Sequence, residues 1–84
     1  MAGRKEPTVE VLIVSPARVV YRGQARSIVF PGERGTFEVL PLHRPLVSRL
    51  VGGPLVVDGR TVMILRGAVR VADDIVTAVV EVAG

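Results

Sequence analysis

Residues 55–62 read Leu55-Val56-Val57-Asp58-Gly59-Arg60-Thr61-Val62, two short valine-rich runs joined by Asp-Gly. This arrangement is typical of a β-hairpin with a two-residue type I′ turn, because glycine tolerates the positive φ that the turn requires. A two-residue turn also fixes which residues face each other. It predicts that Val57 pairs with Arg60 and that Leu55 pairs with Val62. This turn, the clearest structural signal in the sequence, therefore indicates antiparallel β-structure.

A second tight turn, Asp73-Asp74, joins two further extended runs over residues 68–72 and 75–82. Apolar residues recur at every second position in both runs, as expected of strands with one buried face. The predicted register pairs Val71 with Val76, Val69 with Ala78, and Arg70 with Thr77. The C-terminal part of the chain is thus a second predicted hairpin.

Further extended runs fill the rest of the chain and alternate with glycine, proline and serine. The predicted strands are residues 9–14, 18–22, 25–30, 36–39, 46–50, 55–57, 60–65, 68–72 and 75–82. We expect Gly23 to close the second strand and Arg66-Gly67 to end the seventh. Short strands at turn spacings of about 8–12 residues are typical of small sandwiches and barrels, and no long window keeps a helical apolar period. The sequence predicts an all-β fold, a small flattened β-sandwich or barrel of about nine to ten strands.

Length and composition fit one domain. The 84 residues are 49% hydrophobic but only 4% aromatic, and valine dominates, which favours pleated, half-buried strands. The first residues are polar, and Pro7 cannot donate to a strand ladder. We therefore predict a disordered tail over residues 1–8 and a single β-sandwich domain over residues 9–84.

Composition also narrows the functional classes. The sequence has no cysteine, which excludes a disulfide framework and a thiolate metal site. The apolar runs are far shorter than the roughly 20 residues of a membrane span, and no signal peptide is recognisable. We expect a cytoplasmic protein, or one peripheral to a membrane. The net charge of +3 is spread along the chain without a basic run, which favours a solvated surface over an acidic partner.

The residues that enzymes use for catalysis are scarce in this sequence. His43 is the single histidine, and the serines lack the context of an activated nucleophile. Residues 32–35 have the spacing of the GxxG loop of KH domains, but that loop joins helices and these flanks are predicted strands. We expect no catalytic, cofactor or metal site and no nucleic-acid partner. A free-standing adaptor or a nucleic-acid-binding small β-barrel stays open as the alternative.

The strand pattern breaks at residues 31–46, which read PGERGTFEVLPLHRPL. This segment contains three of the six prolines and the histidine. Pro41 and Pro45 fix φ and remove two backbone donors on either side of residues 42–44. A rigid loop on a β scaffold is where a contact surface is expected. We also expect the three aromatic residues, Tyr21, Phe30 and Phe37, to be consumed by the core.

Several motifs, taken together, resemble the N-terminal β-sandwich of the rotary ATP synthase epsilon subunit. The specific motif is Gly-x-Phe-x-x-Leu-Pro-x-His-x-Pro-Leu over residues 35–46. Weaker ones are VLIVSP at 11–16, GPL at 53–55, Arg66-Gly67, and VRVADDIVT at 69–77. Their order and spacing agree with the family from about Val9 to Val80.

The resemblance implies a noncatalytic central-stalk subunit of a proton- or sodium-driven rotary ATP synthase. Such a subunit links gamma to the c-ring, couples rotation to ATP synthesis, and lies peripherally on the inner face of the cell membrane. In this family, the loop with the motif histidine lies on the c-ring side. The implied partner-binding residues are Arg34, Thr36, Leu42, His43 and Arg44.

The sequence departs from the family pattern at a few positions. Leu42 and Arg44 replace a glycine and a small residue beside the motif histidine, Glu38 replaces a glycine, and one glycine of a pair is Arg66. The sequence ends at Gly84, where the family continues into a two-helix hairpin that brakes ATP hydrolysis and in some members binds ATP. We expect no such hairpin in this chain.

Overall fold

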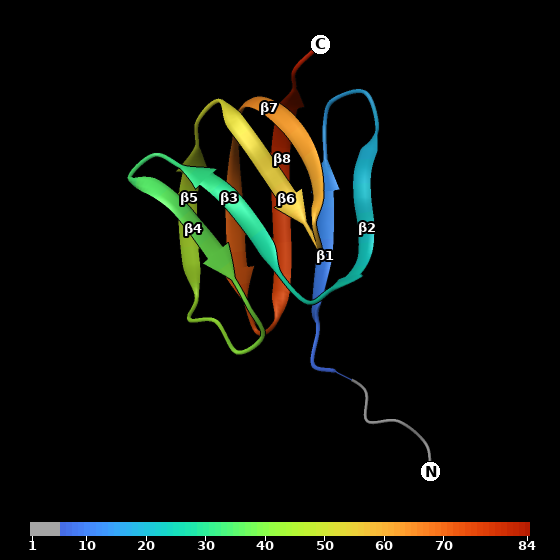
Figure 1. Cartoon of the computed structure of the whole chain (residues 1–84), viewed down its shortest axis with the longest axis vertical. Helices are drawn as coiled ribbons and strands as arrows, with labels where there is room; N and C mark the ends of the chain where they lie inside the picture. Colours follow the sequence, from blue (N-terminus) through green and yellow to red (C-terminus); the bar gives the residue numbers. More distant parts are fainter. Residues whose placement is uncertain (1–5) are drawn as a thin grey trace.

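The computed structural model of the chain describes residues 6–84, and these form eight strands and no helix (Figure 1). The strands are β1 (Val9–Val14), β2 (Val19–Ala25), β3 (Ile28–Gly32), β4 (Gly35–Val39), β5 (Leu46–Leu50), β6 (Gly53–Val57), β7 (Arg60–Ala72) and β8 (Ile75–Val82). The all-β prediction is confirmed. Residues 6–84 contain no helix of the length and apolar character that a membrane crossing requires.

All eight strands belong to one hydrogen-bonded sheet that folds over itself. The order is β2-β1-β8-β7-β5-β3-β4, and β6 pairs with both β3 and β7. Figure 1 shows β3, β4 and β6 in front of β5, β7 and β8, with β1 and β2 at one side. Among these eight strands, only β1 and β8 pair in parallel. The result is a two-layered, partly closed sandwich.

The core lies between the layers and is wholly apolar. It consists of Val9, Val11, Ile13, Ala25, Ile28, Phe30, Val39, Leu50, Leu55, Val57, Ile64, Val69, Val71, Val76, Ala78 and Val80. Among the described residues, no polar or charged side chain is buried. Small branched side chains therefore supply most of the burial, as the composition indicates.

Both predicted hairpin turns are confirmed. Val57 pairs with Arg60 and Leu55 with Val62 around Asp58-Gly59. The φ values of Asp58 and Gly59 are 46° and 82°, the positive pair that a type I′ turn needs. Asp73 and Asp74 also have positive φ, and the predicted register across that turn holds at every pair.

The strand count differs from the expected nine to ten because β7 is continuous. Arg66-Gly67 does not end a strand: β7 runs for 13 residues from Arg60 to Ala72. The pairing with β8 instead shifts between Ile64 and Arg66, which leaves Leu65 as an extra residue. This bulge lets β7 turn from β6 to β5 without a break in the ladder.

Two other expected boundaries were wrong. Gly23 does not close a strand, since it pairs with Val11 in the middle of β2 with φ of 147°. β3 begins later than expected, at Ile28, and extends through Pro31 to Gly32. The Pro31 carbonyl accepts from the Val51 backbone N–H at 2.9 Å. The sheet therefore loses only the backbone N–H that proline lacks.

Residues 1–5 of the expected tail lie outside the described residues. Residues 6–8 are irregular and lie beside β2. Thr8 donates its hydroxyl to the Gln24 side chain at 2.8 Å, and the Arg26 guanidinium pairs with Glu6. The hydrogen bond and charge of Glu6 raise the pKa of Arg26 above its ordinary value. β1 then begins at Val9, as predicted.

Candidate docking surface

The structure divides the five predicted partner-binding residues between the two ends of β4. Arg34 and Thr36 lie at the β3–β4 turn, where Gly32 pairs with Gly35. Leu42, His43 and Arg44 lie beyond the other end, in the connection from β4 to β5. Figure 1 shows this turn and this connection at opposite ends of the strand. The sequence neighbours therefore form two surfaces.

The first surface is the docking loop, defined as residues 40–45. The His43 backbone N–H donates to the Leu40 carbonyl at 3.2 Å, which closes a β-turn with Pro41 in its second position. Leu42, in the third position, has φ of 66°. Proline followed by a residue with positive φ is the combination of a type II turn. The loop is therefore a defined turn, as its prolines predict.

Two further contacts of Leu42 and His43 hold the docking loop. The His43 ring nitrogen Nδ1 lies 2.6 Å from the Arg44 carbonyl oxygen, which orients the imidazole along its own backbone. The Leu42 backbone N–H donates to Asp74 Oδ1 at 2.7 Å. Leu42 and Arg44 are exposed, and His43 is half-buried. These contacts hold the loop while it presents side chains to solvent.

Asp74 supports the docking loop, a role that the sequence does not predict. Besides its carboxylate contact to the docking loop, its backbone carbonyl accepts from the Glu10 N–H at 2.9 Å. It therefore joins the β7–β8 turn, the start of β1 and the loop. The sequence predicts the turn at Asp73-Asp74, but no local signal connects an aspartate there with a loop 32 residues earlier.

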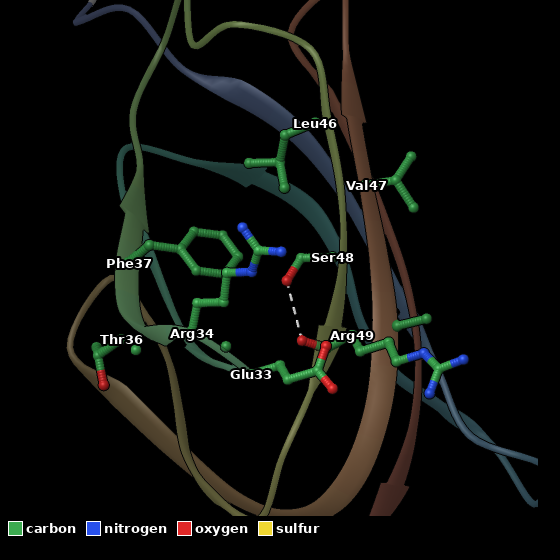
Figure 2. Close-up of a pocket in the computed structure, with 11 residues that line it drawn as sticks. Glu33, Arg34, Thr36, Phe37, Leu46, Val47, Ser48 and Arg49 are labelled. Atoms are coloured by element: carbon green, nitrogen blue, oxygen red, sulfur yellow. Dashed lines mark hydrogen bonds between the residues drawn. The ribbon is translucent and has the colours of Figure 1, made fainter.

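The second surface is the β4–β5 groove, an open hollow of about 880 Å³ lined by residues 32–37, 46–49 and 68. It exists because β4 is the last strand of the order and β5 reaches β3 only through the pair Gly32–Leu50. Figure 2 shows Phe37, Arg34, Leu46 and Ser48 around it, with Val47 on the far side of β5. Arg34 and Thr36 belong to this groove.

Gly32 is required where the groove meets the core. A Cβ atom there would lie 2.7 Å from the Gly35 carbonyl oxygen and 2.7 Å from the Phe37 ring. The ring of Phe37 therefore covers the backbone of Gly32 and stacks on Phe30. Phe30 is buried as expected, whereas Phe37 and Tyr21 are half-buried and pack against the core from outside. The expectation that the core takes up all three aromatics holds fully for Phe30 and only in part for these two.

Both surfaces combine charged and apolar side chains. Within residues 6–84, no three histidine, cysteine, aspartate or glutamate side chains gather as a metal would need. The His43 ring contacts the backbone carbonyl of the adjacent Arg44, and no hydrogen bond or ion pair joins it to a carboxylate of residues 6–84. What the surfaces offer is exposed arginine, a preorganised loop and an apolar groove. The fold is that of a small β-sandwich domain with two candidate contact surfaces.

Comparison with known proteins assigns this domain to a family. Residues 8–84 match the family model described as ATP synthase, Delta/Epsilon chain, beta-sandwich domain. The chain belongs to this family. The ATP synthase epsilon chain of a Nitratiruptor species is 38% identical over 79 residues, which are 88% of this chain and 61% of that one.

A second relative and two solved structures are also similar to this chain. The ATP synthase epsilon chain of Laribacter hongkongensis is 37% identical over 82 residues, 90% of this chain and 59% of that one. The chain thus spans about three fifths of the length of these relatives. A chain of the Euglena gracilis mitochondrial ATP synthase (OSCP/F1/c-ring) has the same fold, with TM-score 0.79 and 20% identity over 93% of this chain and 53% of that one. A chain of the Tetrahymena thermophila mitochondrial ATP synthase central stalk and c-ring also has this fold, with TM-score 0.75 and 17% identity over 93% of this chain and 66% of that one.

Proposed function

We propose that this chain is a noncatalytic rotor subunit of a rotary ATP synthase. It would bind gamma and the polar loops of the c-ring, and so help couple proton- or sodium-driven rotation to ATP synthesis. Its place would be peripheral, on the cytoplasmic face of the membrane. Membership in the delta/epsilon sandwich family supports this role. So do the relatives named ATP synthase epsilon chain.

The observation that carries the proposal is the preorganised docking loop. Its turn hydrogen bond, the His43–Arg44 contact and the bond from Leu42 to Asp74 fix the backbone before any partner arrives. Little ordering entropy is then lost on binding, which favours a mechanical contact that must not yield under torque. We propose Leu42, His43 and Arg44 as partner-binding residues on this loop.

Arg34 and Thr36 would form a separate contact. They lie on the β4–β5 groove, at the other end of β4 from the docking loop. Contacts at two ends of one rigid strand suit a domain that bridges two partners. The groove also carries the half-buried side chains of Phe37 and Leu46 beside Arg34, so a partner with apolar and acidic groups would complement it.

Membranes that retain gamma and the c-ring but have lost this subunit provide the test. The purified 84-residue chain should sediment with them, and cross-linking should recover it with gamma and c subunits. Sedimentation with membranes that lack the synthase would contradict the proposal. Sequence-independent binding to oligonucleotides that is steeply weakened by salt would indicate only the positive charge of the chain, and no binding at about 0.1 M salt would exclude the alternative of a nucleic-acid-binding barrel.

A further inference from the structure

The tip of the docking loop is a leucine in a backbone conformation that leucine disfavours. Leu42 has φ of 66°, whereas glycine would take a positive φ in the third position of this turn without strain. A side chain other than glycine, asparagine or aspartate pays about 1–2 kcal/mol in this region. The strain is local and observed, so it calls for a compensating contact.

Within residues 6–84, the Leu42 side chain gains no burial that would offset this strain. Leu42 is 88% exposed, the highest fraction of any large hydrophobic residue in residues 6–84. An apolar side chain in water adds nothing to folding stability. The leucine therefore costs backbone energy without returning burial energy, unless a partner covers it.

Asp74 keeps the strained residue in place. Its Oδ1 accepts the Leu42 N–H at 2.7 Å, and its own carbonyl is tied to Glu10 at the start of β1. Asp74 is half-buried in the β7–β8 turn, and its carboxylate reaches the loop through this one hydrogen bond. The Leu42 backbone is consequently anchored to the sheet while its side chain points to solvent.

We propose that Leu42 is the apolar anchor of the docking loop and that Asp74 is the residue that positions it. The leucine would enter a shallow apolar recess on a protein partner of the rotor, so this inference rests on the proposed function. A single leucine buries too little apolar area to hold a protein on a lipid surface, which favours a protein recess over the bilayer. The exposed Arg44 guanidinium beside it would face an acidic group of that partner.

The decisive variant is Leu42→Gly, because it should move stability and binding in opposite directions. Glycine relieves the positive φ, so the melting temperature should stay at or above that of the parent. Affinity for synthase membranes that lack this subunit should fall about tenfold, as for an interface anchor. Leu65→Ala is the matched control, since Leu65 is also an exposed leucine but lies at the bulge of β7. Its affinity should equal that of the parent.

Each outcome of this comparison has one meaning. If the parent binds and Leu42→Gly binds equally well, Leu42 is not the anchor while the proposed function stands. If the parent itself fails to bind, the proposed function fails, and this inference fails with it. Equal losses in Leu42→Gly and Leu65→Ala, or comparable binding to protein-free lipid vesicles, would also overturn the anchor role.

Asp74→Gly and Asp74→Asn test the positioning role. Glycine keeps the positive φ of Asp74 (60°) but removes the carboxylate, whereas asparagine keeps both the conformation and an acceptor oxygen. In Asp74→Gly, hydrogen exchange of the Leu42 amide should accelerate about tenfold or more, and membrane affinity should fall severalfold. Asp74→Asn should restore both. Faster exchange with unchanged affinity, or no rescue by asparagine, would overturn the assignment.

Discussion

Phe30 and Phe37 stack across the β3–β4 hairpin with ring centroids 5.5 Å apart and an interplanar angle of 29°. The two rings face each other in register, yet Phe30 is completely buried while Phe37 is half-buried at the edge of the β4–β5 groove. Phe37 thus covers both Phe30 and the backbone of Gly32. The stack seals the core at the point where the sandwich is open.

This difference in burial predicts unequal costs for the two phenylalanines. Phe30→Ala should lower the free energy of unfolding by about 3–5 kcal/mol, because it leaves a closed cavity. Phe37→Ala should cost about 1–2 kcal/mol, since half of its transfer energy and the stacking contact are lost. Urea denaturation of both variants measures the two values. Equal losses would mean that Phe37 is a core residue after all.

The Asp58-Gly59 turn predicts a strain effect that is separable from packing. Gly59 has φ of 82°, and a Cβ atom there would meet nothing within 4 Å. Gly59→Val should therefore destabilise by at least about 1 kcal/mol through backbone strain alone. Gly59→Asn, which tolerates positive φ, should lose clearly less. An unchanged melting temperature for the valine variant would show that the turn is not of this type.

Asp58 stabilises a second connection through its side chain. Its Oδ1 accepts the backbone N–H groups of Arg26 at 2.9 Å and Ser27 at 3.0 Å, in the link between β2 and β3. Asp58→Ala should cost about 1–3 kcal/mol, because two donors lose a charged acceptor and alanine disfavours φ of 46°. Asp58→Asn keeps an acceptor and should recover part of this loss. Thermal unfolding of the two variants, compared with the parent, decides the point.

Local chemistry explains which parts of the fold could be predicted from the sequence. The registers at Asp58-Gly59 and Asp73-Asp74 follow from two-residue turns, whose geometry is set by the turn residues themselves. Gly23 and Arg66-Gly67 were misread because a glycine can either end a strand or lie within one. Which of the two occurs depends on pairing with distant strands, namely β1 for Gly23 and β8 for the bulge at Leu65.

The candidate site was predictable in part for the same reason. Pro41 and Pro45 indicate a rigid loop, and the structure has a defined turn there. The sequence did not predict that Arg34 and Thr36 lie far from residues 42–44. This separation arises because the extended strand β4 lies between the two groups. The support from Asp74 is a tertiary hydrogen bond between segments 32 residues apart, and no periodicity records it.

The last prediction tests whether the docking loop binds the rotor. His43 and Arg44 lie on the loop surface, and the His43 ring contacts only the adjacent Arg44 carbonyl oxygen among the hydrogen bonds of residues 6–84. Replacing both with alanine should change the free energy of unfolding by no more than about 0.5 kcal/mol. If either residue is an interface contact, association with gamma and c-ring assemblies should weaken by about 1 kcal/mol or more.

Two measurements on the double alanine variant separate a loss of stability from a loss of affinity. Urea denaturation shows whether the double alanine variant is folded as well as the parent, and titration of membranes lacking this subunit gives the relative affinity. Arg34→Ala with Thr36→Ala is the companion variant, because it removes an arginine and a neighbouring polar residue of the second proposed contact, at the other end of β4. A loss in both variants is expected if both surfaces contact partners. If the loop variant binds as tightly as the parent while the groove variant does not, the docking surface is the β4–β5 groove. A loss confined to the loop variant would place the contact at His43 and Arg44.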